Sequence, residues 1–237
     1  QPTSSNRSGG PGSLVDWNDL GRQGRNFVGR GPTKKDLQKF SDDVKDPIRV
    51  YVGLNNASTP KIRADIAVRE LERTKAFDRE VLVIAVPTGS GWLEKQGTDS
   101  IEYIYGGDSA IVSTQYSYLP SWISFLVDKE IAKESGTELV NAVYNKWKTL
   151  PTDKRPKLLQ YGLSLGSFGG QAAHDSIEDI TSKVDGAMFV GTPNDTELWQ
   201  EVTKDRDKGS PQRLPVYKEG RSARFASNQK EIEADQT

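Results

Sequence analysis

The fold is decided by the stretch KLLQYGLSLGSFGGQAA at residues 157–173. An apolar run over 157–161 leads directly into Gly162-Leu163-Ser164-Leu165-Gly166, and small residues typical of a tightly packed helix follow. In a G-x-S-x-G pattern the chain turns sharply from strand to helix, which leaves the serine in a strained backbone conformation with its hydroxyl exposed. The glycines are needed because larger side chains would collide with the neighbouring strand and helix. The pattern therefore predicts that Ser164 is a nucleophile above a β-sheet.

Four more short apolar runs surround this stretch, and they are continuous rather than alternating, as in strands covered on both faces. Helical patterns at 61–75 and 121–148 separate them, the second with Gly136 as a break. Alternating strands and helices predict an α/β fold, a three-layer α/β/α sandwich around a mainly parallel sheet. The four other predicted strands are 48–54, 81–87, 110–116 and 186–191.

The chain divides into four parts by composition. Residues 1–13 are rich in Ser, Gly and Pro and are expected to form a flexible linker, and residues 14–47 form an arm. Seven positive and three negative side chains over the first forty residues give a net charge of +4. This arm is either a solvated wrap or lies near an anionic membrane surface. Residues 48–225 form the α/β domain, and 226–237 form a polar tail that is expected to fray.

The composition excludes several kinds of protein and site. The chain has 237 residues, enough for one sizeable core or two small ones at roughly 100–200 residues per domain. It has no cysteine and one histidine, so thiolate chemistry and a histidine-rich metal site are excluded. A net charge of −1 argues against a general nucleic-acid binder. No glycine pattern fits a phosphate loop or a dinucleotide fingerprint, so we expect no cofactor and no metal.

Two backbone N–H groups are expected to stabilise an oxyanion beside Ser164. One belongs to Leu165, at the helix start, and the other to Thr88 or Gly89, in the glycine-bearing loop that follows the strand at 81–86. Aromatic residues concentrate between 92 and 125, beyond the carboxyl ends of strands, where open α/β sheets bind ligands. Most of them are interpreted as packing residues, and the alternative is an acyl pocket. The residues of that pocket would be Trp92, Tyr116, Tyr118 and Trp122.

The acid and the base of a catalytic triad are harder to place. Asp195, after the strand at 186–191, is a candidate acid, but no histidine lies downstream of it. His174 is ten residues past Ser164 on the departing helix, roughly 15 Å along the axis at 1.5 Å per residue, too far for a base. His174 is thus interpreted as a surface or helix-packing residue. We expect the histidine, and the acid, to come from a C-terminal remainder of the protein beyond Thr237.

Four strings resemble the actinobacterial α/β-hydrolase family of membrane proteins. The likeness runs from about Ser13 to Phe225, and its most specific part is Gln115–Asp128. In the usual fold of these hydrolases a hairpin precedes the strand that carries the oxyanion loop, whereas here a helix intervenes and suggests a modified edge. The family's transmembrane helices and its C-terminal strand, acid and histidine are missing from this sequence. The four strings are RVYVGLNNASTPKIRADIAVRELERTKAFDR, VPTGSGW, YIYGGDSAIVSTQYSYLPSWISFLVD and YGLSLGSFGG.

The resemblance implies an α/β-hydrolase-like fold and a serine hydrolase or acyltransferase at the cell envelope. The substrate would be an acyl ester, such as a lipid, and the protein would lie on the extracytoplasmic face of the plasma membrane, tethered by the missing N-terminal helices. Hydrolysis and acyl transfer use the same residues, so the sequence does not separate them. The alternative is a non-catalytic envelope protein that uses this scaffold to bind a lipid or a partner.

Overall fold

The computed structural model describes every residue except 120–122, 124–125 and 235–237. Five strands form one sheet in the order β1-β3-β2-β4-β5, and every pairing is parallel. All five predicted strands are confirmed, with small shifts of their ends. The strands are β1 (Ile48–Val52), β2 (Val81–Val86), β3 (Ser109–Thr114), β4 (Lys157–Leu163) and β5 (Gly186–Val190).

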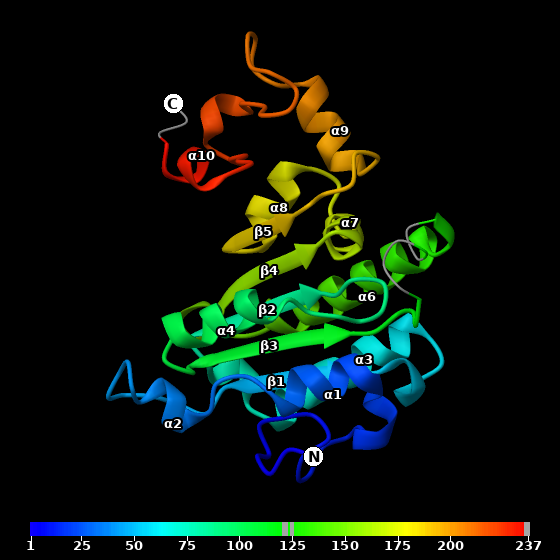
Figure 1. Ribbon diagram of the computed structural model, residues 1–237, viewed down its shortest axis with the longest axis vertical. Coiled ribbons are helices and arrows are strands. Elements are labelled where there is room, and N and C mark those ends of the chain that lie inside the picture. The colour runs from blue at the N-terminus through cyan, green and yellow to red at the C-terminus, as the bar shows by residue number, and fades with distance from the viewer. Residues whose placement is uncertain (120–122, 124–125, 235–237) are drawn as a thin grey trace.

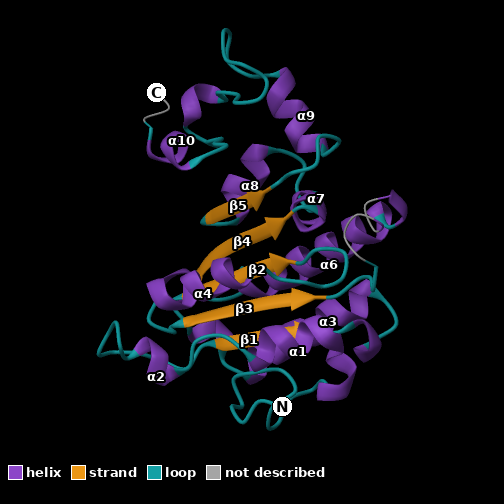
Figure 2. Ribbon diagram, in the orientation of Figure 1, coloured by secondary structure: helices purple, strands orange, loops and turns teal. Residues whose placement is uncertain are grey.

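Helices lie on both faces of the sheet and give the predicted three-layer sandwich (Figures 1 and 2). Helices α3, α6 and α7 pack side by side, whereas α1 contacts β1 and α4 contacts β3. The helix α3 between β1 and β2, and the parallel direction of β1, agree with the modified edge predicted from the sequence. The helices are α1 (Gly21–Gly29), α2 (Lys34–Leu37), α3 (Pro60–Arg73), α4 (Lys95–Ile104), α6 (Lys129–Trp147), α7 (Leu165–Gln171), α8 (Ile177–Lys183), α9 (Glu197–Lys204) and α10 (Gln229–Glu233).

Strand order places the functional end of the sheet between β2 and β4. After β2 the chain returns through α4 to β3 on one side, and after β4 it continues through α7 and α8 to β5 on the other. Neighbouring parallel strands whose connections leave in opposite directions open a crevice at their carboxyl ends, where α/β proteins bind ligands. The loop after β2 and the turn after β4 therefore meet at this crevice.

The N-terminal segment differs from the flexible linker expected for residues 1–13. The Ser8 N–H donates to the carbonyl of Arg49 at 3.0 Å, and the Arg49 N–H donates to the carbonyl of Asn6 at 3.0 Å. Arg7 is buried, and its guanidinium donates to the carbonyls of Val28 and Pro32, among others. An edge strand needs partners for its backbone, and a polar segment supplies them as well as an apolar one does. The segment thus covers the outer edge of β1.

Two further expectations need adjustment. Gly136 does not break the second long helix, because α6 continues through it. The glycine instead lets α7 approach α6 closely, since a Cβ added at Gly136 would lie 2.1 Å from the Gly169 carbonyl oxygen. The polar tail holds the short helix α10, whose first turn is capped by the Asn228 side chain. Among the described residues, no helix combines the length and the apolar character needed to cross a bilayer.

Candidate active site

Ser164 occupies the turn between β4 and α7 in the strained conformation predicted for it. Its backbone has φ 56° and ψ −119°, a region that residues other than glycine rarely adopt. The Ser164 N–H donates to the carbonyl of Val190 at 2.8 Å, and its carbonyl accepts from the Phe168 N–H at 3.1 Å. These two bonds tie the turn to β5 on one side and to α7 on the other. The side chain itself is only half-buried at the carboxyl end of the sheet.

The two glycines of the pattern are required by close backbone contacts. An added Cβ at Gly162 would lie 2.5 Å from the carbonyl oxygen of Gly166, and one at Gly166 would lie 2.2 Å from that of Val86. Real Cβ atoms do not approach backbone oxygens this closely, so either side chain would push α7 away from the sheet. The start of α7 is therefore seated against the end of β2, which brings the loop after β2 beside Ser164.

The loop after β2 is a tight turn closed by its own backbone hydrogen bonds. The Gly91 N–H donates to the carbonyl of Thr88 at 2.8 Å, and the Thr88 N–H donates to the carbonyl of Trp92 at 3.1 Å. Thr88, one of the two donors expected from the sequence, is thus already engaged. Within the described chain, no partner is found for the N–H groups of Gly89 and Leu165. Of the donors expected from the sequence, Leu165 and Gly89 are therefore the two that have no partner among the described residues.

A third loop, after β5, joins the site through a hydrogen-bond network that the sequence did not reveal. The hydroxyls of Ser167 and Thr192 lie 2.7 Å apart, and the Gln171 side-chain amide donates to both, at 3.0 and 3.2 Å. Gln171, the last residue of α7, is the one large polar side chain in a helix of mostly small residues, and this is the feature of the sequence that could have indicated the network. The network fixes the loop after β5 against α7.

The three candidate pocket aromatics that the structure describes lie in different surroundings. Tyr116 is buried in a small cluster with Leu165 and Phe168, and its hydroxyl donates to the carbonyl of Pro87 at 2.9 Å. Tyr118 is 57% exposed and its hydroxyl donates to the Asn55 side chain, and Trp92 is 41% exposed. Trp122 lies outside the described residues. Tyr116 is therefore a packing residue, which was the interpretation favoured for most of these aromatics.

Asp195, the candidate acid, lies on the surface. Its carboxylate forms an ion pair with the Lys129 ammonium of α6, and no contact among the described residues joins it to Ser164. The prediction of an acid at this position thus gains no geometric support here. The described residues also contain no cluster of three or more carboxylates or histidines that could hold a metal ion.

His174 is a buried packing residue with both ring nitrogens engaged. Its Nε2 lies 2.7 Å from the Gln160 Oε1 atom, and its Nδ1 lies 3.0 Å from a carboxylate oxygen of Asp179. The Gln160 amide in turn donates to the carbonyl of Gly170 at 2.7 Å. Burial lowers the pKa of His174, although the bond to Asp179 acts in the opposite direction. His174 therefore connects β4, α7 and α8, and neither ring nitrogen faces Ser164.

Two family models match this chain. The one described as the alpha/beta-hydrolase family covers residues 48–237 and therefore all five strands and the serine turn. The one described as the alpha/beta-hydrolase family N-terminus covers residues 1–32, which include the segment paired with β1. No curated protein and no solved structure matches the chain.

Proposed function

The chain belongs to the α/β-hydrolase family, and from this we propose that it is a serine hydrolase or acyltransferase with Ser164 as nucleophile. The observation that carries the proposal is the backbone of Ser164, at φ 56° and ψ −119° between β4 and α7. Strain of this kind persists only when the surrounding structure enforces it, and it is concentrated at catalytic positions. In this chain the strained residue is a serine, and its hydroxyl lies at the carboxyl end of the sheet.

In the proposed mechanism, the Ser164 oxygen attacks an ester or thioester carbonyl while a base takes its proton. The carbonyl oxygen gains negative charge, which the Leu165 and Gly89 N–H groups stabilise. Collapse of this intermediate expels the alcohol or thiol, which receives the proton, and leaves an acyl-serine. Water or an acceptor alcohol then attacks the acyl-serine and regenerates Ser164. The substrate class, an acyl ester such as an envelope lipid, and the position outside the plasma membrane are proposed from the family resemblance.

The base is the missing component, because the only histidine of these 237 residues is engaged elsewhere. We propose that it comes from a segment of the same protein outside residues 1–237, which also supplies the acid. Such a segment has a place to dock at the edge of the sheet. Within the described sheet, β5 pairs with β4 alone, and Met188 on β5 is 60% exposed.

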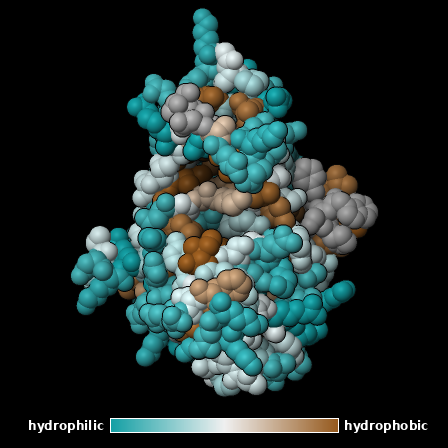
Figure 3. Space-filling view, turned by 60° about the vertical axis from the view of Figure 1, so that its left-hand side comes forward, coloured by the Kyte–Doolittle hydropathy of each residue, from teal (hydrophilic) through white to brown (hydrophobic). Residues whose placement is uncertain are grey.

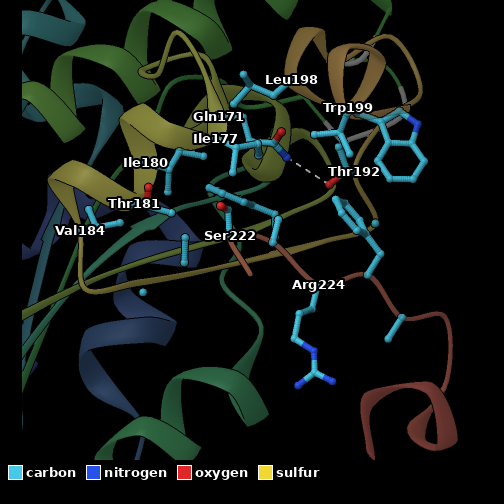
Figure 4. A pocket seen from close by; sticks show the side chains of 18 of the residues that line it. Gln171, Ile177, Ile180, Thr181, Val184, Thr192, Leu198, Trp199, Ser222 and Arg224 are labelled. Atoms are coloured by element: carbon cyan, nitrogen blue, oxygen red, sulfur yellow. Dashed lines mark hydrogen bonds between the residues drawn. The ribbon is translucent and has the colours of Figure 1, made fainter. Parts of the chain in front are cut away.

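The free edge of β5 opens into an apolar groove of about 630 Å³. Figure 3 shows apolar side chains gathered in a hollow between the C-terminal segment and the rest of the molecule. Figure 4 shows Ile180 of α8 and Val184, just after α8, on one wall and Trp199 of α9 on another, with the Arg224 side chain directed away from them. An unpaired strand edge beside an apolar groove favours an added strand. A strand parallel to β5 would end at the same edge of the sheet as Ser164.

Labelling with a fluorophosphonate probe tests the nucleophile. In the whole protein, which holds the proposed base, we expect the probe to modify Ser164, as located by peptide mass spectrometry, and Ser164→Ala to abolish the modification. Ser100→Ala, on an exposed turn of α4, is the matched control and should label like the wild type. A protein that folds but takes no probe at Ser164 would contradict the proposal and favour the non-catalytic scaffold.

Photo-cross-linking from the edge of β5 tests the source of the base. A photoreactive residue at Met188, in the protein as its own cell makes it, should cross-link to a histidine-bearing peptide from outside residues 1–237. Ile62, on α3, is 45% exposed and serves as the control position. Cross-links from Met188 to lipid alone, or full activity of residues 1–237 alone, would overturn this part of the proposal.

A further inference from the structure

The loop after β2 is hydrogen-bonded to three buried side chains of the core. One belongs to β1, and the other two directly follow β3. The Tyr51 hydroxyl donates to the carbonyl of Gly91 at 2.8 Å, and the Gln115 amide donates to that of Ser90 at 3.2 Å. The Tyr116 hydroxyl donates to the carbonyl of Pro87 at 2.9 Å. All three side chains are at most 4% exposed. Burial raises the pKa of both tyrosines, so their hydroxyls stay protonated and able to donate.

The hydrogen bonds within the loop determine which way its peptide groups face. In a trans peptide the carbonyl and the following N–H point in opposite directions. The carbonyl of Thr88 points into the turn, where it accepts from the Gly91 N–H, so the Gly89 N–H points out of the turn. The carbonyls at both ends of the turn are anchored to the core, so the turn as a whole is held in place. The Gly89 donor is thereby fixed before any substrate arrives.

Tyr116 differs from the other two side chains because it touches both halves of the candidate oxyanion site. Its hydroxyl holds the loop after β2, and its ring belongs to the small cluster that contains Leu165 and Phe168 of α7. Val86, the last residue of β2, lies in the same cluster, and its carbonyl abuts Gly166. One residue therefore connects the element that carries the Gly89 N–H to the element that carries the Leu165 N–H.

We infer that Tyr116 is a positioning residue that sets the spacing between the two oxyanion donors, Gly89 and Leu165. The inference rests on the proposed function and adds to it a residue that need not touch substrate. A donor must lie within a few tenths of an ångström of its hydrogen-bond distance to the developing charge. Without the Tyr116 hydroxyl, the carbonyl of Pro87 loses its buried partner and the loop can shift relative to α7.

The test uses Tyr116→Phe, which keeps the ring in its cluster and removes only the hydroxyl. Hydrogen exchange measured by mass spectrometry should become faster in the peptide that covers residues 87–92, with the rest of the sheet unchanged. In the fluorophosphonate assay, the first-order labelling constant at Ser164 should fall about tenfold while the probe's apparent dissociation constant stays the same. Loss of a whole donor would cost more, about 100–1000-fold. Tyr144→Phe, on α6 and away from the site, is the matched control.

The outcomes separate this inference from the proposed function. Unchanged exchange in the loop, or faster exchange with unchanged labelling, would overturn the role of Tyr116 even if Ser164 is the nucleophile. A rise in the dissociation constant alone would instead place Tyr116 in a substrate pocket and also overturn it. If wild-type Ser164 takes no probe, the proposed function itself fails, and an exchange effect would then report only loop stability.

Discussion

Replacing Ser164 with glycine should stabilise the protein while it abolishes the proposed activity. The Ser164 backbone has positive φ and a ψ near −120°, which costs a residue with a Cβ about 1–3 kcal/mol. Glycine adopts this conformation freely but loses about 0.5–1 kcal/mol more chain entropy on folding. No side-chain hydrogen bond of Ser164 with a described residue would be lost. The difference predicts that Ser164→Gly is about 1 kcal/mol more stable than Ser164→Ala, which keeps the Cβ and therefore the strain.

Urea unfolding followed by circular dichroism measures this difference as a shift of the midpoint at constant slope. The matched controls are Ser100→Gly and Ser100→Ala in the exposed interior of α4, where glycine should be the less stable of the two by up to about 1 kcal/mol. The sign of the glycine effect should thus reverse between the two positions. A Ser164→Gly protein no more stable than Ser164→Ala would refute the claim that the turn stores strain.

Three other substitutions follow from the same contacts. Gly166→Ala should lower the free energy of unfolding by about 1–3 kcal/mol in urea and slow probe labelling, because its Cβ would meet the carbonyl of Val86. Glu102→Gln removes the buried charge that pairs with Arg49 at 2.7 Å and should cost about 3–5 kcal/mol, with faster hydrogen exchange in the N-terminal segment. Met188→Lys should leave the free energy of unfolding of residues 1–237 within about 0.5 kcal/mol of wild type, because the side chain is exposed. In the whole protein, the same substitution should prevent docking of the proposed strand.

The strands and the serine turn were predictable because their signals are local. Each strand is a continuous apolar run, and the strain at Ser164 follows from a short pattern of glycines around one residue. The packing role of His174 was also predictable, since ten residues along a departing helix carry a side chain out of reach of the turn. Its partners were not, because Gln160 and Asp179 come from β4 and α8.

The remaining features depend on contacts between distant parts of the chain. Residues 1–13 have the composition of a linker, and that composition does not show that Arg7 pairs with Arg49 of β1, 42 residues further on. The roles of Thr88 and Gly89 were equivalent in sequence and separate only once the turn is closed by its own hydrogen bonds. Tyr116 is one of several aromatic residues between 92 and 125, most of which the sequence favoured as packing residues, and its bond to the Pro87 carbonyl could not be predicted because it joins the end of β3 to the loop after β2.

The site is built from three loops whose adjacency comes from strand order alone. The loop after β2, the serine turn after β4 and the loop after β5 are neighbours because those three strands are consecutive in the sheet. The first two are locked to the core by backbone contacts and by Tyr116, and the third by the network around Gln171. The elements that carry the proposed nucleophile and oxyanion donors are therefore fixed by contacts with the core, whereas the edge of β5 is left open. A base delivered by a strand on that edge would make the proposed activity conditional on docking, whereas the turn that carries Ser164 already has its strained conformation.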